Sequence, residues 1–464
     1  MKVSLLIIVL LLSFACGRAQ LDIGDKGAST ALKIQNLISG ETMVSHNAYL
    51  RLMPASLTKV ITTATALELL GENYTYKTVF SYTGSLENGK LIGDLLVESD
   101  GDPTLGSKYF PQTAPDIFFA DILKHLKRIG VQSVEGSIRV LGAQVSYSAP
   151  RLWEDMGNYY GASPQGFNWH DNTAVITLRS GEVGTECKVV SVDPDIKPYR
   201  LRCKAVAASH SKDSAYVYGL GEIEQWWIEG SIPQHRSSFK IKAALPKPQE
   251  AFVNYLMKYL DKEGVEIHCN RKISLKGQRR RTPIFTYQSP PLSQIIKVVN
   301  HKSNNLFADQ LLLTLGKEIK GRWSWDNGNA VVREFWQDKI DFDTHFRLRD
   351  GSGLTPKNLV SVDGMVKLLE WMYRNSDHFD VYAASLARGG ESGTLRSVFK
   401  NPDLKGRIIG KSGSFEGVLG YCGYATSLAG KKTAFCMISN NYLVSTRQVR
   451  MVMDDVITHI LLEN

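Results

Sequence analysis

The sequence lacks most of the features that place a chain in a special class. It contains no internal repeat and no low-complexity linker. Its longest apolar run, from Val3 to Ala15, is too short to span a bilayer. No C-x-x-C pair and no cluster of histidines suggests a metal, and no cofactor is expected. With 43% hydrophobic and 22% charged residues, the composition is that of an ordinary globular protein.

Dense basic runs are also scarce. Lys and Arg number 55 against 46 Asp and Glu, a formal net charge of +9. Arg279-Arg280-Arg281 is the one dense basic run, and no aromatic residues are interleaved with it, so nucleic-acid binding is not predicted. The mild positive charge suits peripheral contact with a cell wall or membrane, although ordinary solvated surface charge explains it equally well.

The N-terminus has the pattern of a secretory signal. Lys2 precedes the apolar run, and Gly17-Arg18-Ala19 places small residues at positions −3 and −1 of a cleavage site. We therefore expect residues 1–19 to be a signal peptide and the mature protein to be secreted. Cys16 offers a lipoprotein alternative, but Ser13-Phe14-Ala15 is a poor context for lipidation.

Cysteine is rare, with six in 464 residues, and five follow the expected cleavage site. In an oxidising compartment some of these cysteines should pair. Cys422 and Cys436 flank one predicted turn, and Cys187 and Cys203 flank another, so each pair is placed to face across a hairpin. Cys269 is then left without a partner.

The length exceeds what one core usually serves, so two or three domains are expected. Residues 80–282 read mostly as strands and Gly-rich turns, with one helix near 116–129. Residues 20–79 and 283–464 have a different character. The middle block therefore looks like inserted material, two domains with one nested in the other, inside a discontinuous domain.

The outer segments combine strands with helices. Residues 31–36 and 42–51 alternate apolar and polar and predict a hairpin, and residues 418–427 and 432–439 predict another. Amphipathic helices lie between these hairpins, and a further helix, 446–462, ends the chain. This order predicts an α/β (α+β) fold in which helices flank an antiparallel sheet.

The residues 53–59 place a hydroxyl and an amine three positions apart where a long apolar helix begins. Ser56 and Lys59 lie at i and i+3, about 60° apart around a helix, so their side chains are within hydrogen-bond reach. The helix is expected to end at Gly71, a good left-handed terminating residue. A buried Lys59 can then remove the proton of the Ser56 hydroxyl.

This chemistry requires Lys59 to be neutral. A lysine has a pKa near 10.4, so neutrality at pH 7 requires a fall of about 3, from burial and a neighbouring positive charge. A second cation is therefore expected at the site. Free backbone N–H groups in the first turn, with the positive helix end, suit an oxyanion on an attacked carbonyl.

Two further fragments supply such groups. Ser303 and Asn305, in an S-x-N pattern between two helices, offer a proton-relaying hydroxyl and an amide. Lys411-Ser412-Gly413, on a predicted strand, offers the second cation, a hydroxyl for a carboxylate, and a glycine that lets a substrate backbone approach. Three other S-x-x-K matches occur, but none opens a comparable helix; they are Ser209 to Lys212, Ser237 to Lys240 and Ser397 to Lys400.

In this order and setting, the three motifs resemble those of the penicillin-binding proteins and serine β-lactamases. The chain is most similar to the class C low-molecular-mass penicillin-binding proteins, the D-alanyl-D-alanine carboxypeptidase/endopeptidases. The resemblance covers nearly the whole mature chain. It also explains the long gap between Lys59 and Ser303, since this class inserts two domains there. Further signatures of the family are Gly101–Leu105, Trp153-x-Asp155, Tyr159–Ala162, Asp350–Leu354 and Gly393–Leu395.

The resemblance implies a role for each motif residue. Ser56 is the acylated nucleophile, Lys59 the base, and Ser303, Asn305 and Lys411 the proton network. The N–H groups of Ser56 and Ser414 form the oxyanion hole, while Lys411 and Ser412 bind the terminal carboxylate of the substrate and Gly413 lies alongside it. Asp155 reaches toward the amino end of a diaminopimelate side chain. Ser412 stands where threonine is commoner, a change that keeps the hydroxyl.

The implied function is a periplasmic, bacterial serine DD-peptidase that acts on peptidoglycan peptides and is inhibited covalently by β-lactams. Two alternatives remain. A serine β-lactamase would release penicillin quickly, but the long insert argues against it. A catalytically inactive cell-wall or penicillin-binding module is the other alternative, and the three intact motifs argue against it.

Overall fold

The computed structural model describes residues 23–142, 150–221, 223–268 and 280–464. The expected signal peptide, Cys16 and Cys269 lie outside these ranges. The described chain forms two compact units. The first contains the segments up to Asn73, Leu292–Asn304 and Leu311–Asn464, and the second contains Tyr74–Pro291 with Asn305–Gln310.

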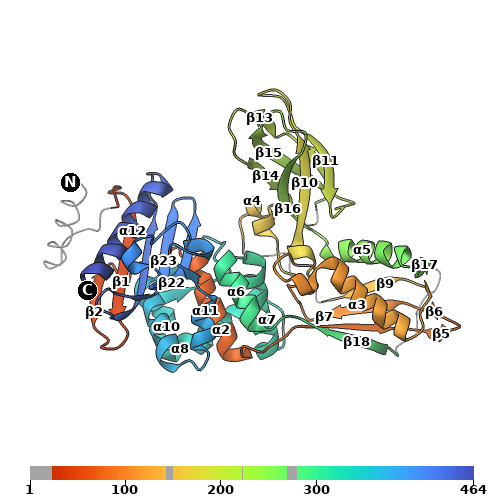
Figure 1. Ribbon diagram of the computed structural model, residues 1–464, viewed down its shortest axis with the longest axis horizontal. Coiled ribbons are helices and arrows are strands. Elements are labelled where there is room, and N and C mark those ends of the chain that lie inside the picture. The colour runs from red at the N-terminus through yellow and green to blue at the C-terminus, as the bar shows by residue number, and fades with distance from the viewer. Residues whose placement is uncertain (1–22, 143–149, 222, 269–279) are drawn as a thin grey trace. The chain divides into compact units, whose positions relative to one another are not determined.

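The first unit is built on an antiparallel sheet of six strands in the order β2-β1-β24-β23-β22-β21 (Figure 1). Both predicted hairpins are present in it. Its strands are β1 (Ser29–Asn36), β2 (Thr42–His46), β21 (Ala387–Arg388), β22 (Ile408–Phe415), β23 (Val418–Thr426) and β24 (Lys432–Asn440).

Strands β23 and β24 are buried along almost their whole length, because helices cover both faces of this sheet. Phe435 and Met437 pack in one apolar cluster with Met453 and Ile457 of α12, while α10 contacts β1 and β24. The predicted α/β fold with a helix-flanked antiparallel sheet is therefore confirmed. The helices of this unit are α2 (Thr58–Leu70), α6 (Leu292–Lys302), α7 (Asn305–Lys320) from Leu311 onward, α8 (Trp325–Ile340), α9 (Phe342–His345), α10 (Val362–Asn375), α11 (Phe379–Ser385) and α12 (Thr446–Glu463).

Short elements complete the first unit. A small sheet joins three strands, and single turns of 3-10 helix precede α2 and the C-terminal strands. These elements are β3 (Arg51–Leu52), β19 (Phe346–Arg347), β20 (Leu359–Ser361), η1 (Ala55–Leu57), η5 (Gly393–Leu395) and η6 (Pro402–Leu404).

The second unit contains four small sheets. Their orders are β18-β4-β7-β9, β17-β8-β6-β5, β11-β10-β16 and β12-β15-β13, with β14 paired to β15. The strands are β4 (Lys77–Tyr82), β5 (Ser85–Glu87), β6 (Lys90–Ile92), β7 (Leu95–Ser99), β8 (Ser133–Glu135), β9 (Ile138–Leu141), β10 (Thr173–Arg179), β11 (Lys188–Asp193), β12 (Arg200–Cys203), β13 (Val206–Ala208), β14 (Ser214–Tyr218), β15 (Gln225–Pro233), β16 (Phe239–Ala244), β17 (Glu266–His268) and β18 (Thr282–Gln288).

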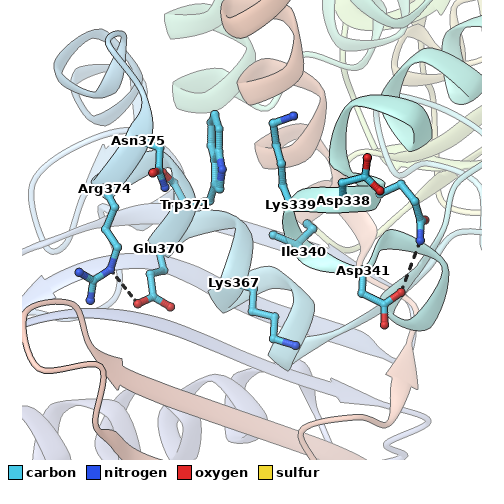
Figure 2. A pocket seen from close by; sticks show the side chains of 10 residues that line it. Asp338, Lys339, Ile340, Asp341, Lys367, Glu370, Trp371, Arg374 and Asn375 are labelled. Atoms are coloured by element: carbon cyan, nitrogen blue, oxygen red, sulfur yellow. Dashed lines mark hydrogen bonds and ion pairs between the residues drawn. The ribbon is translucent and has the colours of Figure 1, made fainter.

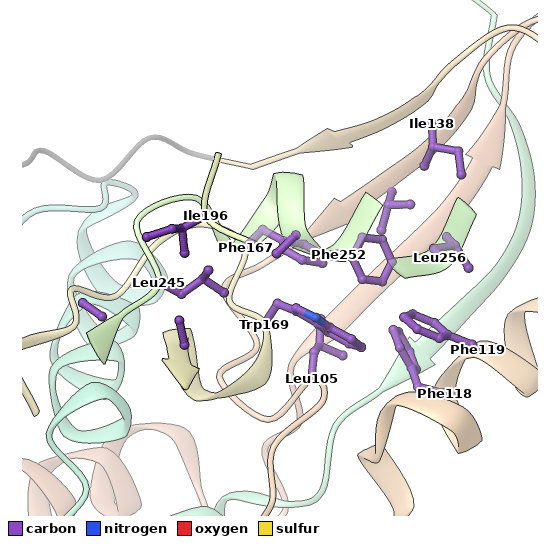
Figure 3. Packing of buried hydrophobic residues seen from close by; sticks show 14 of the residues in the cluster. Leu105, Phe118, Phe119, Ile138, Phe167, Trp169, Ile196, Leu245, Phe252 and Leu256 are labelled. Atoms are coloured by element: carbon purple, nitrogen blue, oxygen red, sulfur yellow. The ribbon is translucent and has the colours of Figure 1, made fainter. Parts of the chain in front are cut away.

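An aromatic core stabilises the second unit (Figure 3). A continuous set of ring contacts joins Phe118 and Phe119 of α3 to Phe252 of α5 and to Trp169, which precedes η4. The sequence predicted α3 but not α5, whose residues read as strand-like. The helical elements of this unit are α3 (Pro115–Arg128), α4 (Trp153–Met156), α5 (Pro248–Lys262), η2 (Pro111–Thr113), η3 (Tyr159–Gly161) and η4 (His170–Asn172).

The cysteines differ from the expectation. Cys422 and Cys436 are directly opposite each other on β23 and β24, as the hairpin predicted, yet both are free thiols in the structure. Cys187 and Cys203 are also free. The predicted pairing is thus wrong for the four described cysteines, because adjacency across a hairpin does not by itself form the bond.

Candidate active site

Ser56 lies in the middle of η1, two residues before the first residue of α2, and Lys59 lies in the first turn of α2. The Nζ atom of Lys59 is 2.9 Å from the Oγ atom of Ser56, so the predicted contact is present. The helix is buried on all sides from Thr58 to Leu67, as suits the long apolar helix that the sequence predicts. It ends at Gly71, which has the expected positive φ of 80°.

The residue before Ser56, Ala55, has a φ of 47°. A non-glycine residue in this region of backbone conformation is strained, and such strain gathers at functional sites. Ser303, between α6 and α7, has a φ of 56° and shares this property. Two of the three motifs therefore stand on strained backbone.

Lys411 of β22 makes a second hydroxyl–amine pair. Its Nζ atom is 2.9 Å from the Oγ atom of Ser303 and 2.5 Å from the carbonyl oxygen of Ser412. Both Lys59 and Lys411 are fully buried. Burial lowers the pKa of Lys411 well below its ordinary value, and the charge of Lys59 lowers it further. The second cation expected near Lys59 is thus present, and the lowered pKa is that of Lys411.

Strand β22 passes beside Ser56. A Cβ atom on Gly413 would lie 2.9 Å from the backbone nitrogen of Ser56 and 2.5 Å from the carbonyl oxygen of Pro54, so only glycine permits this approach. Ser414 follows and is exposed. The structure thus gathers Ser56, Lys59, Ser303, Lys411 and the strand segment 412–414 into one cluster within the first unit.

Asn305 and Asp155 belong to the second unit. The side-chain nitrogen of Asn305 donates to the carbonyl oxygen of Tyr160 at 2.9 Å. Asp155 is half-buried; burial raises its pKa, against the lowering effect of a hydrogen bond with Tyr160. The two predicted residues therefore share Tyr160 as a neighbour. Arg151 and Asp309, both without exposed side-chain surface, form a buried ion pair in the same unit.

The sequence analysis missed one group at the site. The carbonyl oxygen of Ser352 accepts a hydrogen bond from Lys59 at 2.5 Å. The segment Asp350–Leu354 was noted only as a family signature, and a backbone carbonyl carries no side-chain signal from which its role could be predicted.

Other candidate positions are less informative. Ser209, Ser237 and Ser397 do not begin helices. A cavity of about 450 Å³ lies between α8 and α10, lined by Lys339, Lys367, Glu370 and Trp371 among others, and no predicted site residue lines it (Figure 2).

Over the described ranges, no group of three or more His, Cys, Asp or Glu residues could hold a metal. In the same part of the chain, no helix is long and apolar enough to cross a membrane.

Comparisons with known proteins identify similar chains. The chain is 25% identical over 428 residues to the D-alanyl-D-alanine carboxypeptidase DacB of Haemophilus influenzae, covering 90% of this chain and 86% of DacB. It is also 25% identical over 442 residues to a D-alanyl-D-alanine carboxypeptidase of Actinomadura sp., covering 90% and 78% of the two chains.

Solved structures share the fold. The crystal structure of penicillin binding protein 4 (dacB) from H. influenzae matches with a TM-score of 0.78 and 21% identity, over 95% of this chain and 100% of that chain. The same protein complexed with a β-lactam matches with a TM-score of 0.76 and 22% identity, over 94% and 97%. A sequence model of the D-Ala-D-Ala carboxypeptidase 3 (S13) family matches residues 18–460, so the predicted family is confirmed and the chain belongs to it.

Proposed function

We propose that this enzyme cleaves D-Ala-D-X bonds of peptidoglycan stem peptides or cross-links through an acyl-enzyme on Ser56. The observation that carries the proposal is the pair of buried hydroxyl–amine contacts, Ser56 with Lys59 and Ser303 with Lys411. A serine hydroxyl becomes a nucleophile only when a neighbouring base takes its proton, and both amines are placed for proton exchange with a hydroxyl.

In acylation, Lys59 takes the proton of Ser56 as the Oγ atom bonds to the carbonyl carbon of the substrate. The N–H groups of Ser56 and Ser414 stabilise the oxyanion. Lys59 then returns this proton through Ser303, with Asn305 and Lys411 in the network, to the leaving amine as the C–N bond breaks, which leaves Lys59 neutral again. Water attacks the ester as Lys59 takes its proton, and that proton passes to the Oγ atom of Ser56 as the acyl–oxygen bond breaks.

We further propose that Lys411 and Ser412 bind the terminal carboxylate of the substrate, alongside Gly413, and that Asp155 binds an amino group upstream. The preferred substrate is then zwitterionic, with a D-Ala carboxylate and a free diaminopimelate amine. The signal-like residues 1–19 support secretion to the periplasm, where such peptides occur. The domain boundaries proposed from sequence, 80 and 282, lie close to Tyr74 and Pro291, where the second unit begins and ends its longer segment.

Intact mass after reaction with fluorescent penicillin tests the nucleophile. The wild type should gain one long-lived adduct, since a β-lactam acylates the same serine as a peptide. Ser56→Ala should lose labelling and peptide cleavage, while Ser209→Ala, Ser237→Ala and Ser397→Ala keep both. Labelling that persists in Ser56→Ala overturns the assignment. A short-lived adduct would indicate a β-lactamase, and no adduct on the wild type an inactive module.

A further inference from the structure

The turn formed by residues 350–358 holds the start of the helix that carries the nucleophile and base. The hydroxyl of Thr62 donates to the carbonyl oxygen of Gly351 at 2.8 Å. Gly353 has a φ of 77°, and a Cβ atom there would lie 1.8 Å from the carbonyl oxygen of Ala55. The turn and the helix start are therefore packed together too closely for either to shift alone.

Asp350 organises this turn from inside. Its side chain is fully buried, and both of its carboxyl oxygens accept hydrogen bonds. One oxygen accepts from the backbone nitrogen of Gly353 at 2.8 Å and from the side chain of Asn358 at 2.8 Å. The other accepts from the backbone nitrogen of Thr355 at 3.0 Å and, at 3.3 Å, from the hydroxyl of Ser352. Because backbone N–H groups face both oxygens, an amide in this place would always turn its NH₂ group toward a donor.

The turn presents the carbonyl oxygen of Ser352 to Lys59 at 2.5 Å. A neutral amine has two N–H donors and one lone pair. When one N–H is held by Ser352, the lone pair is free to face the hydroxyl of Ser56, 2.9 Å away. Once the amine has taken the proton, the same carbonyl stabilises the ammonium, since hydrogen bonds to a charged donor are the stronger ones.

We propose that Asp350 is a positioning residue for the general base: its carboxylate fixes the turn that aims the Ser352 carbonyl at Lys59. Asp350 acts through this carbonyl and does not touch the reacting atoms. The proposal rests on the proposed function, in which Lys59 takes the proton of Ser56.

The test is the pH dependence of the second-order rate of acylation by penicillin. Asp350→Asn should lower the plateau rate by about 10- to 100-fold, because small misplacement of a catalytic group costs rates of this order. It should also move the midpoint of the acid limb of the pH–rate profile to lower pH, by about 0.5 to 1 pH unit. The reason is that the Lys59 ammonium, with its hydrogen bond to the Ser352 carbonyl weakened, loses its proton more readily. A loss of folded protein alone would scale the rate and leave the limb in place.

Thr62→Val provides a second, milder variant that removes only the tether to the Gly351 carbonyl. It should move the limb in the same direction with a rate loss of about 3-fold. Asp454→Asn is the matched control, because Asp454 is also a partly buried carboxyl that accepts a backbone N–H, from Phe399 at 3.0 Å, but on α12. It should leave the limb unchanged.

An unmoved limb in both Asp350→Asn and Thr62→Val overturns the proposal, and if Asp350→Asn does not fold, Thr62→Val decides alone. A wild type that penicillin does not acylate would instead refute the proposed function itself. The two failures are thus distinguishable.

Discussion

Lys33 and Lys411 are two buried lysines on strands of the same sheet, and their partners differ. The Nζ atom of Lys33, on β1, lies 2.6 Å from a carboxylate oxygen of Asp363, which Lys367 also approaches at 3.0 Å. Lys411, on β22, meets the hydroxyl of Ser303 and the carbonyl of Ser412. Among the described residues, no carboxylate lies within ion-pair distance of Lys411.

The difference gives the two amines different electrostatic surroundings. A buried ammonium is tolerated when an opposite charge compensates its lost hydration, as Asp363 does for Lys33. Burial without such a partner lowers the pKa of Lys411, and the charge of Lys59 lowers it further. The neutral acceptors Ser303 and Ser412 hold the Lys411 amine in place and do not favour its charged form as a carboxylate would. Burial alone therefore does not distinguish the two lysines, whereas the chemistry of their partners does.

Replacing each lysine by methionine tests the comparison most directly. Lys411→Met should lower kcat/KM for peptide cleavage by about 1000-fold or more, because a proton-transfer group is lost. Its unfolding temperature should stay or rise, since an apolar chain of similar length replaces a desolvated amine. Lys33→Met should keep kcat/KM within about 3-fold, at temperatures where both variants are folded. Equal losses of activity would mean that partner chemistry does not separate the two lysines.

Stability should respond in the opposite way. Lys33→Met leaves the buried Asp363 carboxylate with fewer partners and should lower the free energy of unfolding by about 3 kcal/mol, measured in urea. The double variant Lys33→Met with Asp363→Leu should recover most of that loss, because a buried pair replaced by apolar residues is often neutral. A double variant no more stable than the single one would contradict this account.

Carboxylates extend the comparison. Burial acts to raise the pKa of Asp363, but hydrogen bonds from Lys33 and Lys367 bring it below its usual value, so its stabilising effect is lost as pH falls through that lowered pKa.

Asp102, fully buried and with one oxygen lacking a hydrogen-bond partner, has its pKa raised by burial to about 7. Protonated Asp102 is the form that the fold favours, so stability is lost as pH rises from about 4 to 7.

Ionisation of Asp102 should therefore lower the free energy of unfolding of the wild-type second unit by at most roughly 3 kcal/mol between pH 5 and pH 8. Asp102→Asn should remove most of this dependence, because the amide can still accept from Thr104 and carries no charge. Urea unfolding at both pH values measures it. An unchanged pH dependence in Asp102→Asn would assign the effect to another group.

Asp155 should show the smallest effect. Like Lys411, which is fully buried, the half-buried Asp155 has a neutral hydrogen-bond partner. That partner is Tyr160. Asp155→Asn should lower kcat/KM by about 10-fold on peptides with a free amino end and barely change it on acetylated peptides. Equal loss on both peptides would make Asp155 a structural residue.

Much of the first unit was predictable because its signals are local. The two hairpins, the helix ending at Gly71 and the reach from Ser56 to Lys59 follow from alternation, a glycine and helix geometry. The hairpin and helix signals need no knowledge of residues distant in the chain, whereas Ser303 and Lys411 were assigned from the order of three motifs spread from Ser56 to Gly413.

The rest depended on distant contacts. The pairing of Lys33 with Asp363 joins residues 330 positions apart, and nothing in either segment marks it. The Ser352 carbonyl belongs to the backbone and has no residue type of its own. Helix α5 buries Phe252 and Leu256 in an aromatic core that assembles only in the folded unit. The free thiols of Cys422 and Cys436 show that register alone does not determine bonding.

Strand β22 pairs with β23 along its whole length but with β21 only at Ile409 and Gly410. From Lys411 onward, its other edge has no strand partner among the described residues. An extended peptide lying along this edge would add a strand to the sheet and be bound through its main chain, which every peptide offers. Selection among peptides would then fall to their charged ends, so the enzyme would tolerate varied side chains next to the cleaved bond.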